Sequence, residues 1–142
     1  DTDSADGVAT AEIVAPISIV HDANAVLDFG TMVTDVAGTV TVNAAGAATA
    51  TGPKLLTGST NSADSFTVSG DAGRSFSIST GNGTVTSGTD TMSFTTSPSA
   101  ATGTLNATSG DANFTVGGVL TVAADQAAGA YTGSYTATAT YN

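Results

Sequence analysis

The 142 residues include only two basic side chains, Lys54 and Arg74, against twelve acidic ones, and the formal net charge is -10. This balance excludes an ordinary nucleic-acid interface, because no cluster of cations exists to contact phosphates. The chain has no cysteine, is dominated by small residues and Thr, and is poor in helix-forming residues, which excludes disulfide stapling and a helical bundle.

The length suits one domain with its own core, preceded by an N-terminal arm. Residues 1–6 are small and acidic and predict a solvated tip. Residues 7–20 alternate with the two-residue period of a strand, and one side of that strand is wholly apolar. We therefore predict an arm and donor strand over residues 1–20 and a β-sandwich over residues 21–142. The apolar side of the arm consists of Ala9, Ala11, Ile13, Ala15, Ile17 and Ile19.

The first half of the predicted sandwich contains several short strands. Alternating runs at 26–32 and 38–43 each place two large apolar side chains on one side. Residues 44–52 are small and predict a loop or a weak edge strand. The runs 65–69 and 75–79 flank a turn rich in Gly and Asp, which indicates either a hairpin or a corner at which the chain changes sheets.

The second half continues the same pattern. Runs at 84–86 and 91–95 predict two more strands, and residues 96–110 predict a surface excursion. The pair Gly117-Gly118 divides the run 113–122 and predicts a hairpin or a bulged pair of strands. The last run, 131–141, places tyrosines and alanines on one side and hydroxyl residues on the other. Short strands at this spacing are typical of an all-β sandwich.

The final strand would be exposed as an edge unless another segment covers it. It contains no charge and no proline, so an open edge there would invite aggregation. The arm is the segment with a matching apolar side, and Pro16 suits a strand at the rim of a sheet. The arm either folds back onto its own chain or adds a strand to a second copy.

No pattern typical of an active site is present. The single histidine, His21, lies beside Asp22 in a predicted solvated loop, and no nucleophile motif accompanies it. The aspartates are scattered over turns, where they accept backbone hydrogen bonds, and form no calcium loop. We expect no enzyme activity, no cofactor, no metal site, no nucleic-acid partner and no membrane insertion. The start at Asp1 in place of Met predicts an exported, secreted protein.

Five segments together resemble a known group of proteins. They are an apolar N-terminal strand, LDFGTM at 27–32, GTVTVNAAG at 38–46, FTVSG at 66–70 and GAYTGSYTATATYN at 129–142. In this order they resemble bacterial secreted pilin-like domains of the spore-coat-U and archaic chaperone-usher type, over residues 9–142.

The resemblance implies an incomplete immunoglobulin-like β-sandwich that is completed by a donor strand from a neighbouring subunit. It implies a fimbrial subunit, assembled head-to-tail by donor-strand exchange into a cell-surface filament for adhesion or biofilm formation. The implied partners are identical subunits, a periplasmic chaperone and an outer-membrane usher. The alternative is a self-complemented monomeric β-sandwich that serves as a surface adhesin or a carbohydrate-binding module.

The resemblance also assigns residues to the two halves of this contact. The implied donor-strand plug consists of Ala9, Ala11, Ile13, Ala15 and Ile17. The implied acceptor groove consists of Tyr131, Tyr135, Ala137, Ala139 and Tyr141.

Overall fold

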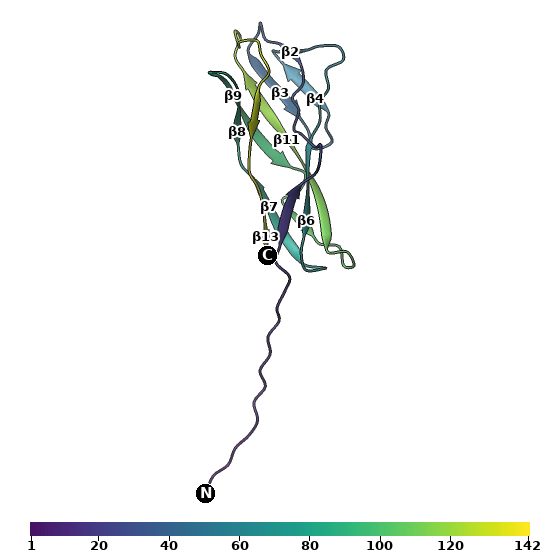
Figure 1. Cartoon of the computed structure of the whole chain (residues 1–142), viewed down its shortest axis with the longest axis vertical. Helices are drawn as coiled ribbons and strands as arrows, with labels where there is room; N and C mark the ends of the chain where they lie inside the picture. The colour runs from purple at the N-terminus through teal and green to yellow at the C-terminus, as the bar shows by residue number, and fades with distance from the viewer.

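A computed structural model describes residues 1–142 as thirteen strands without a helix, and so without a helix that could span a membrane (Figure 1). The strands are β1 (Ser18–His21), β2 (Met32–Val33), β3 (Gly38–Val42), β4 (Ala48–Thr51), β5 (Lys54–Leu55), β6 (Asp64–Ser69), β7 (Ser75–Thr80), β8 (Gly83–Ser87), β9 (Asp90–Pro98), β10 (Thr102–Thr104), β11 (Asp111–Val122), β12 (Thr132–Ser134) and β13 (Ala137–Tyr141).

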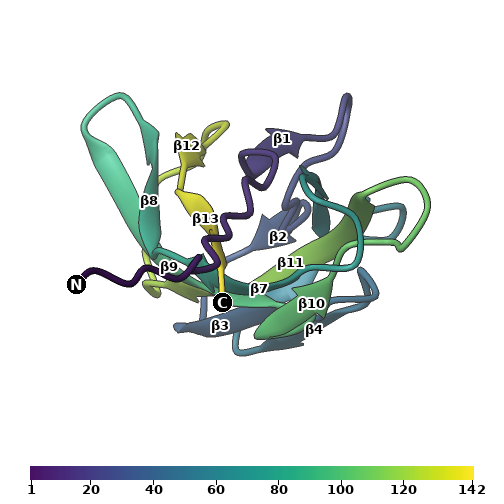
Figure 2. The ribbon, with the colours of Figure 1, turned by 90° about the horizontal axis from the view of Figure 1, so that it is seen from below.

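The strands form curled antiparallel sheets, which confirms the predicted all-β class. The largest sheet has eight strands, ordered β1-β6-β11-β9-β8-β12, with β3 paired to β11 and β4 paired to β3. A three-stranded sheet has the order β10-β7-β13, and β2 pairs with β5. Seen along the long axis, the ribbon is an open ring, with β1 and β12 at opposite margins of the opening (Figure 2). Completion by a neighbouring subunit stays a prediction.

The long strand β11 replaces the hairpin or bulged pair of strands predicted around Gly117-Gly118. It pairs with β6 along its first half, and with β9 and β3 along its second half. Both glycines are buried, and neither has a positive φ. A Cβ at Gly117 would meet the carbonyl oxygen of Val42, and one at Gly118 would meet that of Thr95. These glycines therefore permit neighbouring backbones to approach closely, and the prediction of a turn was wrong.

The apolar interior consists of two clusters stacked along the molecule. We call them the upper and lower clusters, the lower being nearer the arm in Figure 1. Inward residues of β3, β9 and β11 dominate the upper cluster, and those of β6, β7 and β11 dominate the lower one. The upper cluster is Phe29, Val40, Val42, Phe94, Leu120 and Val122. The lower cluster is Phe66, Val68, Phe76, Ile78, Leu105, Phe114 and Val116.

Two other local predictions differ from the structure, and it decides between two alternatives for the turn at residues 70–74. The region predicted as a surface excursion contains β10 and the fully buried Leu105, whose burial anchors that segment to the lower cluster. The run 26–32 forms only an isolated bridge between Asp28 and Ser62 before β2 begins. Strands β6 and β7 belong to different sheets, which confirms the alternative of a corner at which the chain changes sheets.

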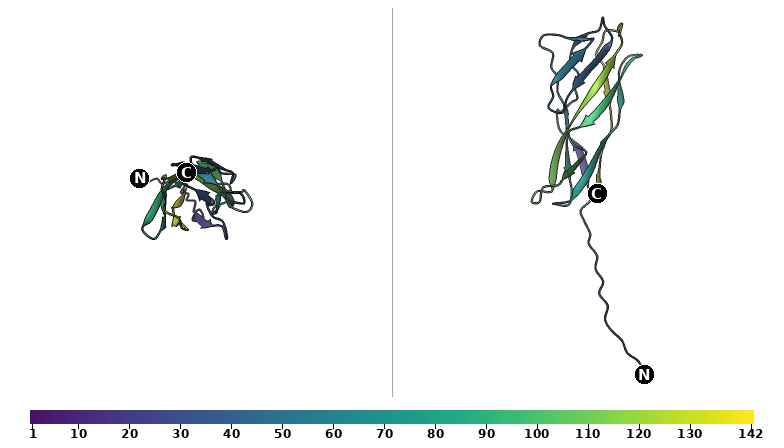
Figure 3. Two further views of the ribbon diagram at one scale, coloured as in Figure 1. Left: turned by 90° about the horizontal axis from the view of Figure 1, so that it is seen from above. Right: turned by 180° about the vertical axis from the view of Figure 1, so that it is seen from behind.

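The N-terminal arm extends away from the sandwich, beside the C-terminus (Figures 1 and 3). Residues 1–17 pair with no strand, and regular pairing begins only at Ser18, where β1 joins β6. Of the strand predicted over residues 7–20, only residues 18–20 form a strand, as part of β1. The backbone hydrogen-bonding groups of the extended remainder are therefore not paired with any strand of their own chain.

Candidate functional site

A cavity of about 1320 Å³ opens between the two margins of the eight-stranded sheet. We call this cavity the groove. One side consists of His21 at the end of β1 and residues 25–35, and the other consists of residues 124–135, which include β12. The groove therefore lies where the curled sheet fails to close on itself.

Strand β12 has a free backbone edge beside the groove, and the unpaired edge of β1 reaches the groove only at His21. Strand β12 pairs with β8 alone, and β1 pairs with β6 alone, so each ends the order of the large sheet. Such an edge presents unpaired N–H and C=O groups to any extended segment that approaches it. The site can therefore accept one further strand by β-augmentation.

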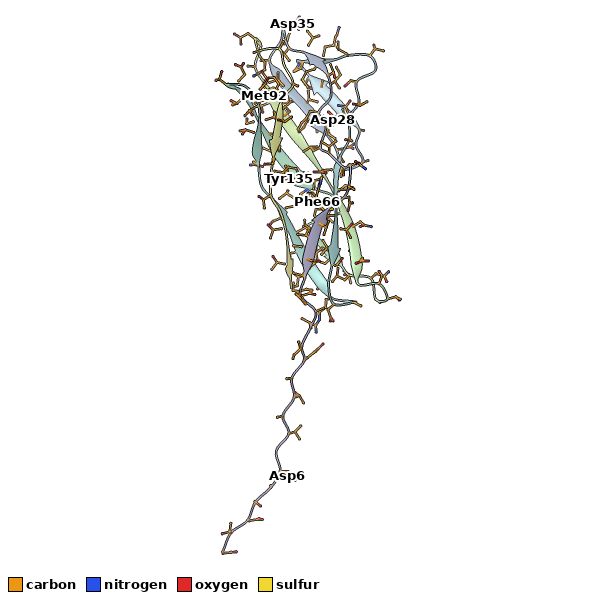
Figure 4. The ribbon with its side chains drawn as sticks, viewed as in Figure 1. Asp6, Asp28, Asp35, Phe66, Met92 and Tyr135 are labelled. Carbon is orange, nitrogen blue, oxygen red and sulfur yellow. The ribbon has the colours of Figure 1, made fainter.

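The floor of the groove is apolar. Phe29, Phe94 and Leu120 of the upper cluster lie beneath it and are almost fully buried. Leu27 and Met92 are half-buried there and add flexible apolar surface. Figure 4 places Met92, Tyr135 and Phe66 along the groove, with Asp6 far away on the arm. A strand with one apolar side fits such a floor.

A buried carboxylate closes the lower end of the groove. Asp64, on β6, is 5 % exposed. Its Oδ1 is 2.5 Å from Nε2 of His21, and its Oδ2 accepts a hydrogen bond of 2.7 Å from the Tyr135 hydroxyl. We call these three residues the Asp64 junction. Because His21 and Tyr135 come from opposite margins, the junction ties the two margins together.

Burial, followed by the hydrogen bond to Asp64, raises the pKa of Tyr135 above the ordinary value for a tyrosine. The Tyr135 hydroxyl therefore stays protonated and remains a donor to the carboxylate. Tyr135 also lies edge-on to Phe66 and Phe94, one from each cluster, with ring centroids 6.2 and 6.0 Å away. It is thus fixed at the boundary between the clusters.

The prediction of a loop for His21 was wrong, although its side chain is solvated as expected, at 49 % exposure. The residue ends β1, opposite Phe66, and its ring packs edge-on against that phenylalanine with centroids 5.1 Å apart. Its Nε2 contacts Asp64, and no serine hydroxyl is hydrogen-bonded to the ring. The neighbouring Ser65 hydroxyl instead donates to Asp22 at 2.7 Å. This arrangement holds strands together and presents no activated nucleophile.

The adjacent Asp22 stabilises the outer side of the same margin. Its carboxylate accepts hydrogen bonds from the hydroxyls of Thr67 and Ser65, at 2.6 and 2.7 Å. These two bonds, Thr67 first, lower the pKa of Asp22 below the ordinary aspartate value. The carboxylate therefore remains ionised as it braces β1 against β6.

Sequence reasoning missed Asp64, although a signal was present. In the alternating run of β6, Asp64 shares its parity with Phe66 and Val68, and all three are buried. A carboxylate on the inward side of a strand needs a partner, because an unpaired buried charge is costly. The only histidine, His21, and a tyrosine of the last predicted run, Tyr135, were the candidate partners.

The predicted acceptor residues separate into two groups. Tyr131 and Tyr135 line the groove. The other three, Ala137, Ala139 and Tyr141, do not line it and instead pack against the lower cluster. The alternation predicted for this segment is confirmed, since the tyrosines and alanines lie on the inner side and the threonines between them are exposed.

The predicted plug residues also separate into two groups. Ala9, Ala11, Ile13 and Ala15 are exposed, and Ile13 is 96 % exposed. Ile17, in contrast, is half-buried against the lower cluster of its own sandwich. An isoleucine at this exposure leaves apolar surface without a partner within its own chain.

The base of the arm is held by its own sandwich. The Tyr141 hydroxyl donates to the carbonyl oxygen of Ala15 at 2.6 Å, and Arg74 contacts Glu12 at 2.6 Å. Arg74 also contacts Asp71 at 3.2 Å. These contacts direct the arm away from the groove of its own chain.

A family model with the description "Domain of unknown function (DUF4402)" matches residues 17–141. The chain therefore belongs to this family. The match begins at Ile17, where the arm joins the sandwich. No curated protein and no solved structure matches the chain.

Proposed function

We propose that this protein is a structural subunit of an extracellular pilus or fibre, assembled head-to-tail by donor-strand exchange. One observation carries the proposal. The chain presents an extended arm with an exposed apolar side, and it presents a groove with an apolar floor beside the unpaired edge of β12. The arm has an apolar side without a partner, and the groove has an apolar floor on which that side can be buried.

The placement of these surfaces favours a filament over a closed dimer. The arm leaves the lower end of the sandwich, whereas the groove lies above the Asp64 junction (Figures 1 and 4). Donor and acceptor are different surfaces, so each added subunit offers a new arm or a new groove. The contact then repeats along an axis.

The same placement fixes the direction of the docked arm. If subunits stack end to end, the arm of one subunit enters the groove of the next from above. In this orientation the arm runs antiparallel to β12, which descends toward the C-terminus. The free edge of β12 would then be hydrogen-bonded along its length.

The interactions available are strong enough for a durable filament. Full burial of the Ile13 side chain contributes about 1.5–3 kcal/mol. Each added backbone hydrogen bond contributes a net ~0.5–1.5 kcal/mol, before the cost of ordering is subtracted. Before assembly the groove needs a temporary occupant. In this proposal a periplasmic chaperone has that role, and an outer-membrane usher exchanges it for the arm.

The exchange is tested by two substitutions on opposite sides of the arm. Ile13→Asp should abolish assembly, because the carboxylate would have to enter an apolar groove. Thr10→Asp adds the same charge on the other side and should assemble as the unaltered protein does. Assembly is measured by sedimentation and negative-stain microscopy.

Equal behaviour of the two variants would contradict the proposal. A full-length protein that remains monomeric at every concentration would favour the alternative of a self-complemented adhesin or carbohydrate-binding module.

A further inference from the structure

We propose that a docked arm occupies only the upper part of the gap between β1 and the final strand, and that the Asp64 junction is its lower stop. This inference rests on the proposed function and goes further, because it assigns the acceptor surface and the register. The occupant is the arm of a second copy of this chain.

The lower part of the gap is already filled by the chain itself. Strands β1 and β13 are in contact there, although they do not pair. Their side chains pack together against the lower cluster, and none of these side chains lines the groove. The residues concerned are Ile17, Ile19, Ala137, Ala139 and Tyr141.

The Asp64 junction separates this filled part from the groove. A strand that continued past it would have to part His21 from Tyr135, and both contact Asp64. The 5 % exposed carboxylate would then lie buried without those partners, which is unfavourable. The docked strand is therefore expected to end at the junction.

The anchored base of the arm limits which residue reaches the apolar floor. Ile17 remains with its own sandwich, and the Ala15 carbonyl is held by Tyr141. Ile13, which is 96 % exposed although the neighbouring Glu12 contacts Arg74 of its own chain, is then the one large residue of the apolar side that can enter a neighbour. Four residues of extended chain, roughly 13 Å, separate it from Ile17, which places it near the mouth of the groove.

The apolar floor suits this register. At the upper part of the groove, the half-buried Met92 presents an apolar surface for one branched side chain. Because the arm runs antiparallel to β12, Ala11 and Ala9 follow Ile13 toward the junction. Their small side chains fit beside Tyr135, where the two margins are tied together.

Cysteine pairs test this assignment, since the chain has no cysteine of its own. The full-length variant with Ile13→Cys and Met92→Cys should oxidise in air into a ladder of covalent multimers, resolved by non-reducing electrophoresis. The matched variant with Ile13→Cys and Ala139→Cys should give dimers at most, because only its arm cysteines can meet. The single variants Ile13→Cys and Met92→Cys are the controls and cannot form a ladder.

Each result has a defined meaning. A ladder from the Met92 pair alone supports the inference. A ladder from the Ala139 pair alone overturns it while leaving donor-strand exchange intact. Sedimenting assemblies that give no ladder from either pair also overturn the register. If neither variant forms a ladder or sedimenting assemblies, and the unaltered chain is also monomeric under the same conditions, the proposed function itself is overturned.

Discussion

At the scale of single residues, the Asp64 junction is the least ordinary feature of the molecule. A buried carboxylate between a histidine and a tyrosine adds little to the stability of the fold. Replacing such a polar group by a well-packed apolar residue often leaves a protein equally stable. Its advantage is geometric. The junction fixes two strand margins at one height and leaves the gap above them open.

Removal of the Tyr135 hydroxyl should destabilise the sandwich. Tyr135→Phe keeps the ring but takes one donor from the buried Asp64 carboxylate, which should lower the free energy of unfolding by about 1–3 kcal/mol. The matched control is Tyr131→Phe, whose hydroxyl donates to the Ala127 carbonyl at an exposed position. Urea unfolding of both variants measures the difference, and equal effects would contradict a structural role for the junction.

At the scale of elements, alternation predicted most strands because it depends on local sequence. Strand β3 and the inner side of β13 appear where the pattern placed them. The pattern could not predict which strands pair, because pairing depends on contacts between residues distant in the chain. It therefore missed the change of partners along β11 and the burial of Leu105.

The candidate site, like the strands, could be predicted from the sequence only where it depends on the local pattern of residues. The apolar side of the arm and the inward tyrosines follow from the two-residue period. The Asp64 junction does not, because His21, Asp64 and Tyr135 come from three distant segments. The sequence also could not show that the acceptor residues after Tyr135 lie outside the groove. That outcome depends on the contact between β1 and β13, which are distant in the chain.

One substitution distinguishes the continuous strand β11 from the predicted hairpin. Asn-Gly is a favoured hairpin turn, so a hairpin would tolerate Gly117→Asn. In the strand, the new side chain meets the Val42 carbonyl, and we expect a loss of about 1–3 kcal/mol or more.

The control for this prediction is Gly88→Asn. Gly88 is in a real turn, with a φ of 62°, and nothing lies within 4 Å of a Cβ built there. Thermal or urea unfolding should find this variant nearly unchanged. If Gly117→Asn is as mild as Gly88→Asn, β11 is not continuous in solution.

At the scale of the whole molecule, assembly must overcome repulsion between like charges. The net charge is -10, and acidic side chains occur on the arm, at Asp6 and Glu12, and beside the groove, at Asp28, Asp35 and Asp125. Salt should therefore accelerate assembly, because the Debye length falls from about 30 Å at 0.01 M to ~8 Å at 0.15 M. Light scattering measures the rate, and slower assembly at the higher salt concentration would mean that attraction between charges guides docking.

The central claim is that the arm of one copy fills the groove of another, and a mixing experiment tests it most directly. Ile13→Asp disables the arm and leaves the groove intact, whereas Met92→Arg obstructs the groove and leaves the arm intact. We predict that each variant alone sediments as a monomer and that an equimolar mixture forms a one-to-one dimer that grows no further. A mixture that stays monomeric while the unaltered chain assembles, or either variant alone forming filaments, would contradict the account.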